Sequence, residues 1–176
     1  MLLGLWKDTE KYKDVYWSKF ESLYYPGDYA IKDSDGYLWL LGRSDDVLKV
    51  AGHRIGTAEV EDAINQDNKV IESAVVGFPH EIKGQGIFGF VIVKNQDDKT
   101  DYFNSIRNTV SKYIGPIAKP DKILVVPGLP KTRSGKIMRR ILRKIASDEF
   151  NNFGDISTLL NPEIVDQIIS SYKKLK

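Results

Sequence analysis

The order of β-rich and helix-periodic segments between Val47 and Val126 limits the possible folds of this chain more than any other feature. Strands show as apolar alternation or β-branched runs, and helices show as apolar residues repeating every three to four positions. A strand is expected at 47–55 and then a helix from Thr57, which would cap that helix. Two strands follow at 72–79 and 87–93, then a helix at 102–114 and a last strand at 122–126. The series predicts an α+β fold, in which a few-stranded sheet is packed by helices.

A β-hairpin is predicted ahead of this domain. Residues 29–32 and 37–41 are β-rich, and Asp35-Gly36 between them supplies the positive φ that a tight turn needs. Small and polar residues at 42–46 interrupt the hairpin before a new pattern begins at Val47. We therefore expect a domain boundary within this interruption.

Two further helices are predicted after the last strand, over 134–147 and 162–175, and Pro162 suits the first position of the second one. The first helix is amphipathic, with an apolar stripe expected to be buried and a basic face expected to point outward. The stripe is Ile137, Met138, Ile141, Leu142 and Ile145, and the basic face is Arg139, Arg140, Arg143 and Lys144. Two interpretations of this face stay open, a solvated surface or a surface for nucleic acid or membrane.

Composition excludes several classes of function. With 26 basic and 24 acidic residues the net charge is +2, which is too small to indicate a nucleic-acid or membrane partner by itself. The absence of cysteine excludes disulfides and thiolate nucleophiles, and two histidines are too few for a histidine-based metal cluster. No apolar run approaches the ~18 residues of a membrane span, and charges come too early for a signal peptide, so a cytoplasmic location is expected. Residues 1–25 show no clear period and predict no element.

Two glycine-bearing stretches invite a nucleotide-binding interpretation. Gly84-Gln85-Gly86-Ile87-Phe88-Gly89 matches G-x-G-x-x-G, but a strand follows it instead of a helix, so these glycines are predicted to serve a hairpin or close packing. Gly135 and Lys136 stand at the predicted start of a helix, where backbone N–H groups favour anions. This stretch is not a Walker loop, since the first glycine of that motif is missing and Ile137 follows the lysine.

Four motifs, in order over residues 20–146, resemble the closing motifs of the adenylate-forming superfamily, specifically its acetyl-coenzyme A synthetase branch. They are Tyr25-Pro26-Gly27-Asp28, residues 42–47, residues 52–61 beginning Gly52-His53-Arg54-Ile55-Gly56, and residues 130–143 beginning Pro130-Lys131-Thr132-Arg133-Ser134-Gly135-Lys136. The resemblance implies that residues 1–44 end a large adenylate-forming domain and that residues 45–176 form a small mobile C-terminal lid.

The reaction implied by this resemblance is that of an acid–CoA ligase, which converts acetate, ATP and coenzyme A to acetyl-CoA, AMP and pyrophosphate. The carboxylate attacks the α-phosphate of ATP and releases pyrophosphate, and the acyl-adenylate then passes to the coenzyme A thiol. The lid would rotate between an adenylation pose and a thioester-forming pose, with Asp45 at the hinge. The implied cofactors are ATP or AMP, coenzyme A and Mg²⁺.

The resemblance also implies roles for individual residues. Asp28 would bind the ribose hydroxyls as a bidentate acceptor, and Arg43 would reach the same sugar. Arg54 would pair with the nucleotide phosphate in the thioester-forming pose, and Gly52 would line the tunnel for the pantetheine arm. Lys136 would be the adenylation lysine, which neutralises two anions as they approach, and its acetylation would switch adenylation off.

Two departures from the family pattern concern coenzyme A. Ser111 stands where the family often has an arginine for the 3′-phosphate, although Lys112 could substitute as a point charge. Ala51 stands where the family often has a serine, so one hydroxyl contact is absent. The backbone carbonyls implied for the family's structural magnesium ion are those of Asn65, Asp67 and Val70.

The phosphate loop, the acyl pocket and most adenine contacts of the family belong to the large domain and are not found in this chain. The isolated chain is therefore expected to be inactive, with the missing N-terminal domain and a small carboxylate as partners, and an acetyltransferase and deacetylase acting on Lys136. The length of the acyl group is not readable. Two alternatives stay open: a stand-alone binding or regulatory module that is a lysine acetyltransferase substrate, and a nucleic-acid-binding domain using residues 131–144.

Overall fold

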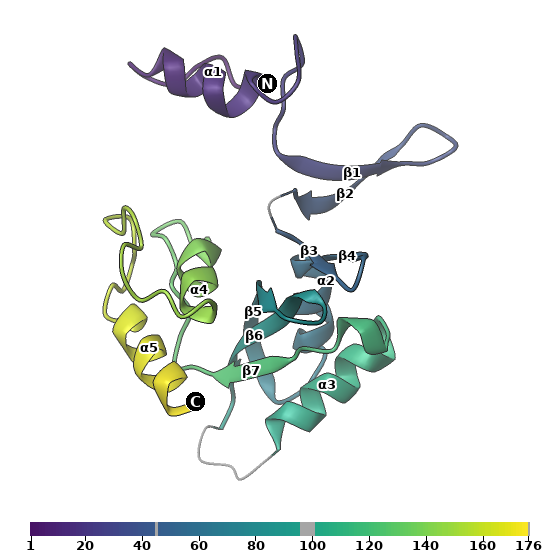
Figure 1. Ribbon diagram of the computed structural model, residues 1–176, viewed down its shortest axis with the longest axis vertical. Helices are drawn as coiled ribbons and strands as arrows, with labels where there is room; N and C mark the ends of the chain where they lie inside the picture. The colour runs from purple at the N-terminus through teal and green to yellow at the C-terminus, as the bar shows by residue number, and fades with distance from the viewer. Residues whose placement is uncertain (45, 96–100, 176) are drawn as a thin grey trace. The chain divides into compact units, whose positions relative to one another are not determined.

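The computed structural model describes residues 1–44, 46–95 and 101–175 (Figure 1). These residues form two compact units, Met1–Val47 and Leu48–Lys176. Asp45, the residue expected at the hinge, lies outside the described residues. None of the described helices is long and apolar enough to cross a membrane.

The first unit contains helix α1 (Thr9–Trp17) and an antiparallel hairpin of β1 (Asp28–Lys32) and β2 (Leu38–Arg43). The predicted hairpin is confirmed, and Gly36 in its turn has a φ of 90°. The helix was not predicted, because it buries none of its residues and its sequence therefore carries no apolar period. Its N-terminus is capped by the side chain of Asp8, which accepts a hydrogen bond from the amide of Lys11 at 3.1 Å.

The second unit is built on a sheet to which five of the described strands belong. Two long strands, β5 (Val70–His80) and β6 (Gly84–Val93), pair antiparallel along their length. On its other side β6 pairs with β3 (Val47–Val50) and, in parallel, with β7 (Lys122–Val125), while β4 (His53–Gly56) lies beyond β3. The helices of this unit are α2 (Thr57–Asn65), α3 (Tyr102–Tyr113), α4 (Arg139–Ala146) and α5 (Ile164–Leu175), with a short 3₁₀ turn at Pro116–Ala118. The predicted α+β fold is confirmed, and so is the element order except at 47–55, where a single strand was predicted and the positive φ values of Ala51 and Gly52 turn the chain between two strands.

Side chains of β6 alternate between two hydrophobic cores on opposite faces of the sheet. Phe88 and Phe90 pack into the core that contains α4 and α5, whereas Ile87 and Val91 pack into the core that contains α2 and α3. All four side chains are fully buried. In Figure 1 the pair α4 and α5 lies on one side of β5, β6 and β7, and α3 lies on the other. The two faces of the sheet are thus covered by different helices.

The glycines of the G-x-G-x-x-G stretch serve the β5–β6 hairpin, as predicted. Gly84 has a φ of 74° at the end of the hairpin turn. A Cβ on Gly86 would lie 2.5 Å from Cε1 of Phe78, and a Cβ on Gly89 would lie 3.5 Å from Cδ1 of Ile64. Turn geometry explains Gly84 and close packing explains Gly86 without a dinucleotide, whereas a Cβ on Gly89 would make only an ordinary van der Waals contact.

Three predicted helix starts were wrong. Helix α2 begins at Thr57 itself, so Gly56 is the N-cap and Thr57 does not cap the helix. Helix α4 begins at Arg139 instead of 134, because the preceding residues form a loop in which Gly135 has a φ of 83°. Helix α5 begins at Ile164 instead of 162. The carbonyl of Pro162, which precedes the helix, accepts a hydrogen bond from the amide of Val165.

Candidate functional site

Residues 130–138 form a tight loop, so Lys136 does not lie in the first turn of a helix as predicted. The amides of Thr132 and Gly135 donate to the carbonyls of Lys136 and Thr132, each at 2.8 Å. The amide of Lys136 donates to Oγ1 of Thr132 at 3.1 Å. Hydrogen bonds within the loop therefore fix the backbone of Lys136 while its side chain is exposed. This loop, 130–138, is called the Lys136 loop below.

A downstream segment, residues 155–160, holds the Lys136 loop in place and is called the strap. The amide of Arg133 donates to the carbonyl of Thr158 at 3.1 Å, and the amide of Leu160 donates to the carbonyl of Lys131 at 2.9 Å. Between them, Leu159 is 3% exposed and packs into the core of α4 and α5. The sequence did not identify the strap, because backbone hydrogen bonds leave no side-chain signal.

Side-chain contacts tie the strap and the loop to the rest of this unit. The carboxylate of Asp155 accepts a hydrogen bond from the amide of Ser157 at 2.9 Å. Hydrogen bonds from Ser157, with a smaller contribution from the charge of Arg140, lower the pKa of Asp155. Arg140 also donates to the carbonyl of Asp155, and Lys131 forms an ion pair with Glu72 of β5 at 2.7 Å. The basic residues of 131–144 are thus partly occupied by contacts within the chain.

Arg139 was predicted to point outward and instead forms an internal ion pair with Glu61. Its Nη2 lies 2.6 Å from Oε2 of Glu61, and its Nε lies 3.1 Å from Oε1. Oε1 also accepts the amide of Val75 of β5 at 2.7 Å. Only 10% of the Glu61 side chain is exposed. This contact joins α4, which follows the Lys136 loop, to α2 and β5.

The expected coenzyme A residues Ala51 and Gly52 form the turn between β3 and β4. Their φ values are 47° and 85°, and this left-handed conformation explains the glycine by itself. A Cβ on Gly52 would meet no atom within 4 Å. Arg54 lies two residues after the turn on β4 and is exposed. The structure therefore brings these three residues together, and they form what we call the Gly52 turn.

In the first unit, Asp28 and Arg43 are paired residues at the ends of β1 and β2. Nη1 of Arg43 lies 3.7 Å from Oδ1 of Asp28 and donates to the carbonyl of Pro26 at 3.0 Å. The guanidinium covers Gly27, where a Cβ would lie 2.9 Å from Nη2 of Arg43. Gly27 has a φ of 83°, so its backbone conformation favours a glycine. About half of each charged side chain stays exposed, at 45% for Asp28 and 53% for Arg43.

The remaining expected site residues lie on other elements. Ser111 and Lys112 lie in the last turn of α3, where Lys112 is exposed. In the turn after α2, the carboxylate of Asp67 accepts hydrogen bonds from the amide of Lys69 and the hydroxyl of Ser105.

The residues expected to bind magnesium lie at this turn, and oxygens of two of them already accept hydrogen bonds within the chain. The carbonyl of Asp67 accepts the amide of Val70 at 2.9 Å, and the side-chain oxygen of Asn65 accepts the hydroxyl of Ser73 at 2.9 Å. Among the described residues no group of three or more His, Asp or Glu side chains could hold a metal ion. The geometry of this turn is explained by its own hydrogen bonds, so no step below depends on magnesium.

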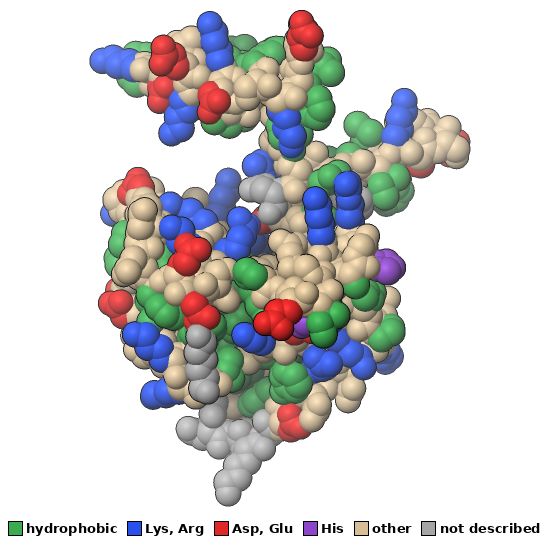
Figure 2. All heavy atoms as spheres, in the orientation of Figure 1, with side chains coloured by type: hydrophobic (Ala, Val, Ile, Leu, Met, Phe, Trp, Pro, Cys, Tyr) green, Lys and Arg blue, Asp and Glu red, His purple; other side chains and the backbone are tan. Residues whose placement is uncertain are grey.

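Charged side chains over the second unit are of both signs, and Figure 2 shows Lys and Arg interspersed with Asp and Glu there. This distribution matches the net charge of +2. The exposed features that stand out for chemistry are therefore local: the Lys136 loop and the Gly52 turn in the second unit, and the Asp28–Arg43 pair in the first.

Comparison with known proteins relates part of this chain to a known family. Residues 59–136 match the AMP-binding enzyme C-terminal domain. Over 172 residues, or 97% of this chain, 53% of positions are identical to the acetyl-coenzyme A synthetase of Syntrophobacter fumaroxidans. That match covers 26% of the relative, so the chain spans about a quarter of its length.

Solved structures agree with this assignment. The anthranilate CoA ligase AuaEII, in complex with anthranoyl-AMP, is 34% identical over 82% of this chain and 28% of that protein, with a TM-score of 0.69. Acetoacetyl-CoA synthetase from Streptomyces lividans shares the fold with a TM-score of 0.78 over 96% of this chain and 25% of that protein, at 24% identity. Residues 59–136 therefore belong to the C-terminal domain family of AMP-binding enzymes, and the chain is similar over nearly its whole length to acetyl-coenzyme A synthetases.

Proposed function

We propose that this chain forms the C-terminal part of an acid–CoA ligase that makes acetyl-CoA from acetate, ATP and coenzyme A. The observation that carries the proposal is Lys136, an exposed lysine on a backbone fixed by Thr132, within a chain that is 53% identical to an acetyl-coenzyme A synthetase. Residues 1–44 would end the large adenylate-forming domain, and residues 45–176 would form the lid.

In the adenylation step, a carboxylate oxygen attacks the α-phosphorus of ATP and pyrophosphate leaves. Both reactants are anions, so the ammonium of Lys136 would offset their repulsion and the charge that develops in the transition state. A fixed loop suits this task, because a charge that is already positioned does not need to reorganise during the reaction. Asp28 and Arg43 would bind the ribose, since a half-exposed carboxylate accepts the sugar hydroxyls and the adjacent guanidinium donates to its oxygens.

In the second step, the coenzyme A thiolate attacks the acyl carbon and AMP leaves. Arg54 would pair with the nucleotide phosphate, and the Gly52 turn would border the path of the pantetheine arm. Ala51, Ser111 and Lys112 are the other candidates for contact with the coenzyme. We propose that the lid rotates about Asp45 between the two steps, so that the Lys136 loop serves the first and the Gly52 turn serves the second.

The test is a chimera in which residues 1–176 replace the matching quarter of the Syntrophobacter fumaroxidans relative. Acetate-dependent pyrophosphate release reports adenylation, and transfer from preformed acetyl-adenylate to coenzyme A reports thioester formation. Lys136→Ala should lower adenylation by about 10²- to 10³-fold and leave thioester formation unchanged. The matched control is Lys174→Ala, which removes the same charge from an exposed position on α5. A folded chimera that is inactive in both half-reactions would refute the proposal.

The exposed amine of Lys136 also favours a regulatory role as an acetyltransferase substrate. Acetylation removes the positive charge, so it should stop adenylation as Lys136→Ala does. The measurement compares pyrophosphate release by the chimera before and after enzymatic acetylation, with a deacetylase to restore activity. Equal rates would rule this regulation out. Residues 1–176 by themselves should be inactive in both half-reactions, because they match only about a quarter of the length of the relative.

A further inference from the structure

We propose that Lys83 and Asp121 are positioning residues for the Gly52 turn, and that the thioester-forming step depends on them while adenylation does not. This inference rests on the proposed function and adds to it two residues that no motif of the sequence singled out. They act through the tip of the β5–β6 hairpin, which is hydrogen-bonded to the start of the Gly52 turn.

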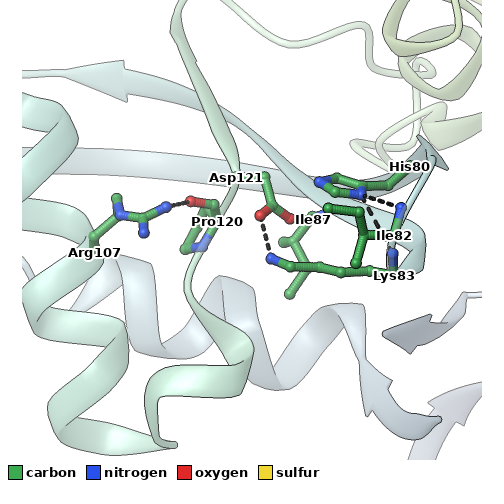
Figure 3. Close-up of polar contacts among 7 residues, drawn as sticks. All are labelled: His80, Ile82, Lys83, Ile87, Arg107, Pro120 and Asp121. Carbon is green, nitrogen blue, oxygen red and sulfur yellow. Dashed lines mark hydrogen bonds and ion pairs between the residues drawn. The ribbon is translucent and has the colours of Figure 1, made fainter. Parts of the chain in front are cut away.

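Asp121 joins three parts of the second unit (Figure 3). Its amide donates to the carbonyl of Ile87 at 2.8 Å, and its Oδ2 accepts the amide of Ile87 at 2.9 Å. These two bonds fix the residue that precedes β7 against β6. The other carboxylate oxygen, Oδ1, pairs with Nζ of Lys83. The pair is partly shielded from water, since 17% of the Asp121 side chain and 32% of the Lys83 side chain are exposed.

The hairpin tip that carries Lys83 is shaped by His80. Its Nδ1 accepts the amides of Ile82 at 3.2 Å and Lys83 at 3.3 Å, and Figure 3 shows the ring lying over the turn. Gly84 completes the turn with a φ of 74°. The side chains of His80 and Asp121 therefore hold the backbone of Lys83 and its ammonium, respectively.

The carbonyl of Lys83 is the contact that reaches the Gly52 turn. It accepts the amide of Ala51 at 3.1 Å. Two neighbouring contacts reinforce it, because Val50 pairs with Gly84 in the sheet and Oε1 of Gln85 accepts the amide of Lys49 at 2.8 Å. The start of the turn is thus attached to the hairpin tip at successive residues.

This attachment matters because the turn is strained. Ala51 has a φ of 47°, a left-handed conformation that is unfavourable for an L-residue with a Cβ. Such a conformation persists where surrounding contacts over-determine it. If the Lys83–Asp121 pair is broken, the hairpin tip loses its attachment to β7, and the turn loses the support for Ala51. Arg54, two residues after the turn, would then be displaced from its working position.

The Lys136 loop does not share this support. Its described backbone contacts run to the strap, and Lys131 pairs with Glu72 in β5, far from the hairpin tip in sequence. Loosening the tip should therefore affect one half-reaction and spare the other. A general loss of folding would lower both.

The experiment uses Lys83→Met in the chimera, because methionine keeps most of the side-chain volume and removes the charge. The thioester half-reaction should lose about tenfold in kcat/KM for coenzyme A, since small displacements of a positioning group have effects of this order or larger. Adenylation should stay within about twofold, which is the spread of a surface substitution. Lys83→Arg should restore the thioester rate, and Lys94→Met, at an exposed lysine, is the matched control.

A second readout uses residues 1–176 alone. Amide exchange at Ala51 should be faster in Lys83→Met, while exchange at Lys136 should not change. Unchanged exchange at Ala51, or faster exchange with an unchanged thioester rate, would overturn the inference, as would an equal loss in both half-reactions. If the parental chimera is inactive in both half-reactions, the proposed function and the catalytic part of this inference are refuted together. That result differs from a failure of this inference alone, because it appears before any Lys83 variant is made.

Discussion

The Lys136 loop and the Gly52 turn are both tight turns that expose a basic residue, but they are built on opposite faces of one sheet. Ile137 and Met138 of the Lys136 loop pack on the core of α4 and α5. Val50 and Ile55, which flank the Gly52 turn, belong to the core of α2 and α3. The two turns therefore belong to one sheet but pack on different hydrophobic cores.

Their anchors also differ in kind. The Lys136 loop is held by backbone hydrogen bonds to the strap, which lies later in the chain. The Gly52 turn is held by the neighbouring β5–β6 hairpin, whose tip is fixed by the charged pair of Lys83 and Asp121. Under the proposed function this separation is useful, because each of the two candidate surfaces can be positioned without constraining the other. The predictions below break or sharpen this comparison.

The largest effect is expected from Glu61→Ala, which should remove the contact common to both faces. Arg139 would lose its bidentate partner, and the amide of Val75 would lose its acceptor. Breaking a buried ion pair by removing one partner costs about 3–5 kcal/mol. Urea unfolding followed by circular dichroism measures this loss in residues 1–176. Glu61→Gln keeps the packing and an acceptor for both groups and should cost clearly less; an equal cost would mean that the whole loss comes from the negative charge and none from the acceptor or the packing.

A smaller effect is expected from Gly52→Ala, which tests the turn alone. The new Cβ would meet no atom within 4 Å, so backbone strain at a φ of 85° is the main cost, at roughly 1–2 kcal/mol. If Gly52 also borders the pantetheine path, the thioester half-reaction of the chimera should fall by more than this strain explains. Adenylation provides the internal control. A thioester rate that only follows the stability loss would show that Gly52 serves the turn and not the coenzyme.

Leu160→Pro tests the strap and the Lys136 loop in the same way. Proline removes the amide that donates to the carbonyl of Lys131, and a typical hydrogen bond contributes about 1 kcal/mol. Leu160 is 60% exposed, so little packing is lost. Leu160→Ala keeps the amide and is the matched control. Adenylation should fall in the proline variant and thioester formation should not, and the reverse order would contradict the separation of the two faces.

The sequence predicted the elements with a strong apolar period and missed those without one. Strands β5 and β6 and helix α3 were predicted to within a few residues, because each buries an alternating or amphipathic face. Helix α1 buries no residue and left no such signal. The late start of α4 was missed because apolar residues at 137 and 138 continue the helical stripe while belonging to the Lys136 loop.

Prediction of the candidate site shows the same limit. The motifs located Asp28, Arg43 and Gly52 in the chain, and the structure explains the positions of the first two as facing strand ends. The inward direction of Arg139 could not be predicted, because Glu61 lies far away in sequence and pairs with it only in the fold. The strap was equally hidden, since backbone bonds do not depend on residue type. Local pattern therefore finds candidate site residues more readily than the contacts that position them.

A further effect, confined to the α4 and α5 face, is expected only at high pH. Tyr172 of α5 packs against Phe88 and Phe150 with ring centroids 5.9 Å apart in each case. Burial, with a contribution from Asp148, raises the pKa of Tyr172 to about 12 from its ordinary value of 10.0. Between these values the unfolded chain releases the phenolic proton and the folded chain keeps it. Stability is therefore fully present below pH 10 and is lost as the pH rises toward 12.

Tyr172→Phe separates this contribution from general alkaline unfolding, because phenylalanine keeps the ring contacts and cannot ionise. The unfolding temperature of residues 1–176, measured between pH 9 and 12 by circular dichroism, should fall less steeply in the variant than in the parent over the interval that the raised pKa defines. Tyr113→Phe, at an exposed tyrosine at the end of α3, is the matched control and should follow the parent curve. Parallel curves for Tyr172→Phe and the parent would show that ionisation of this tyrosine does not affect the packing of α5. The face with the strap and the Lys136 loop would then be no more sensitive to alkali through Tyr172 than the face with the Gly52 turn.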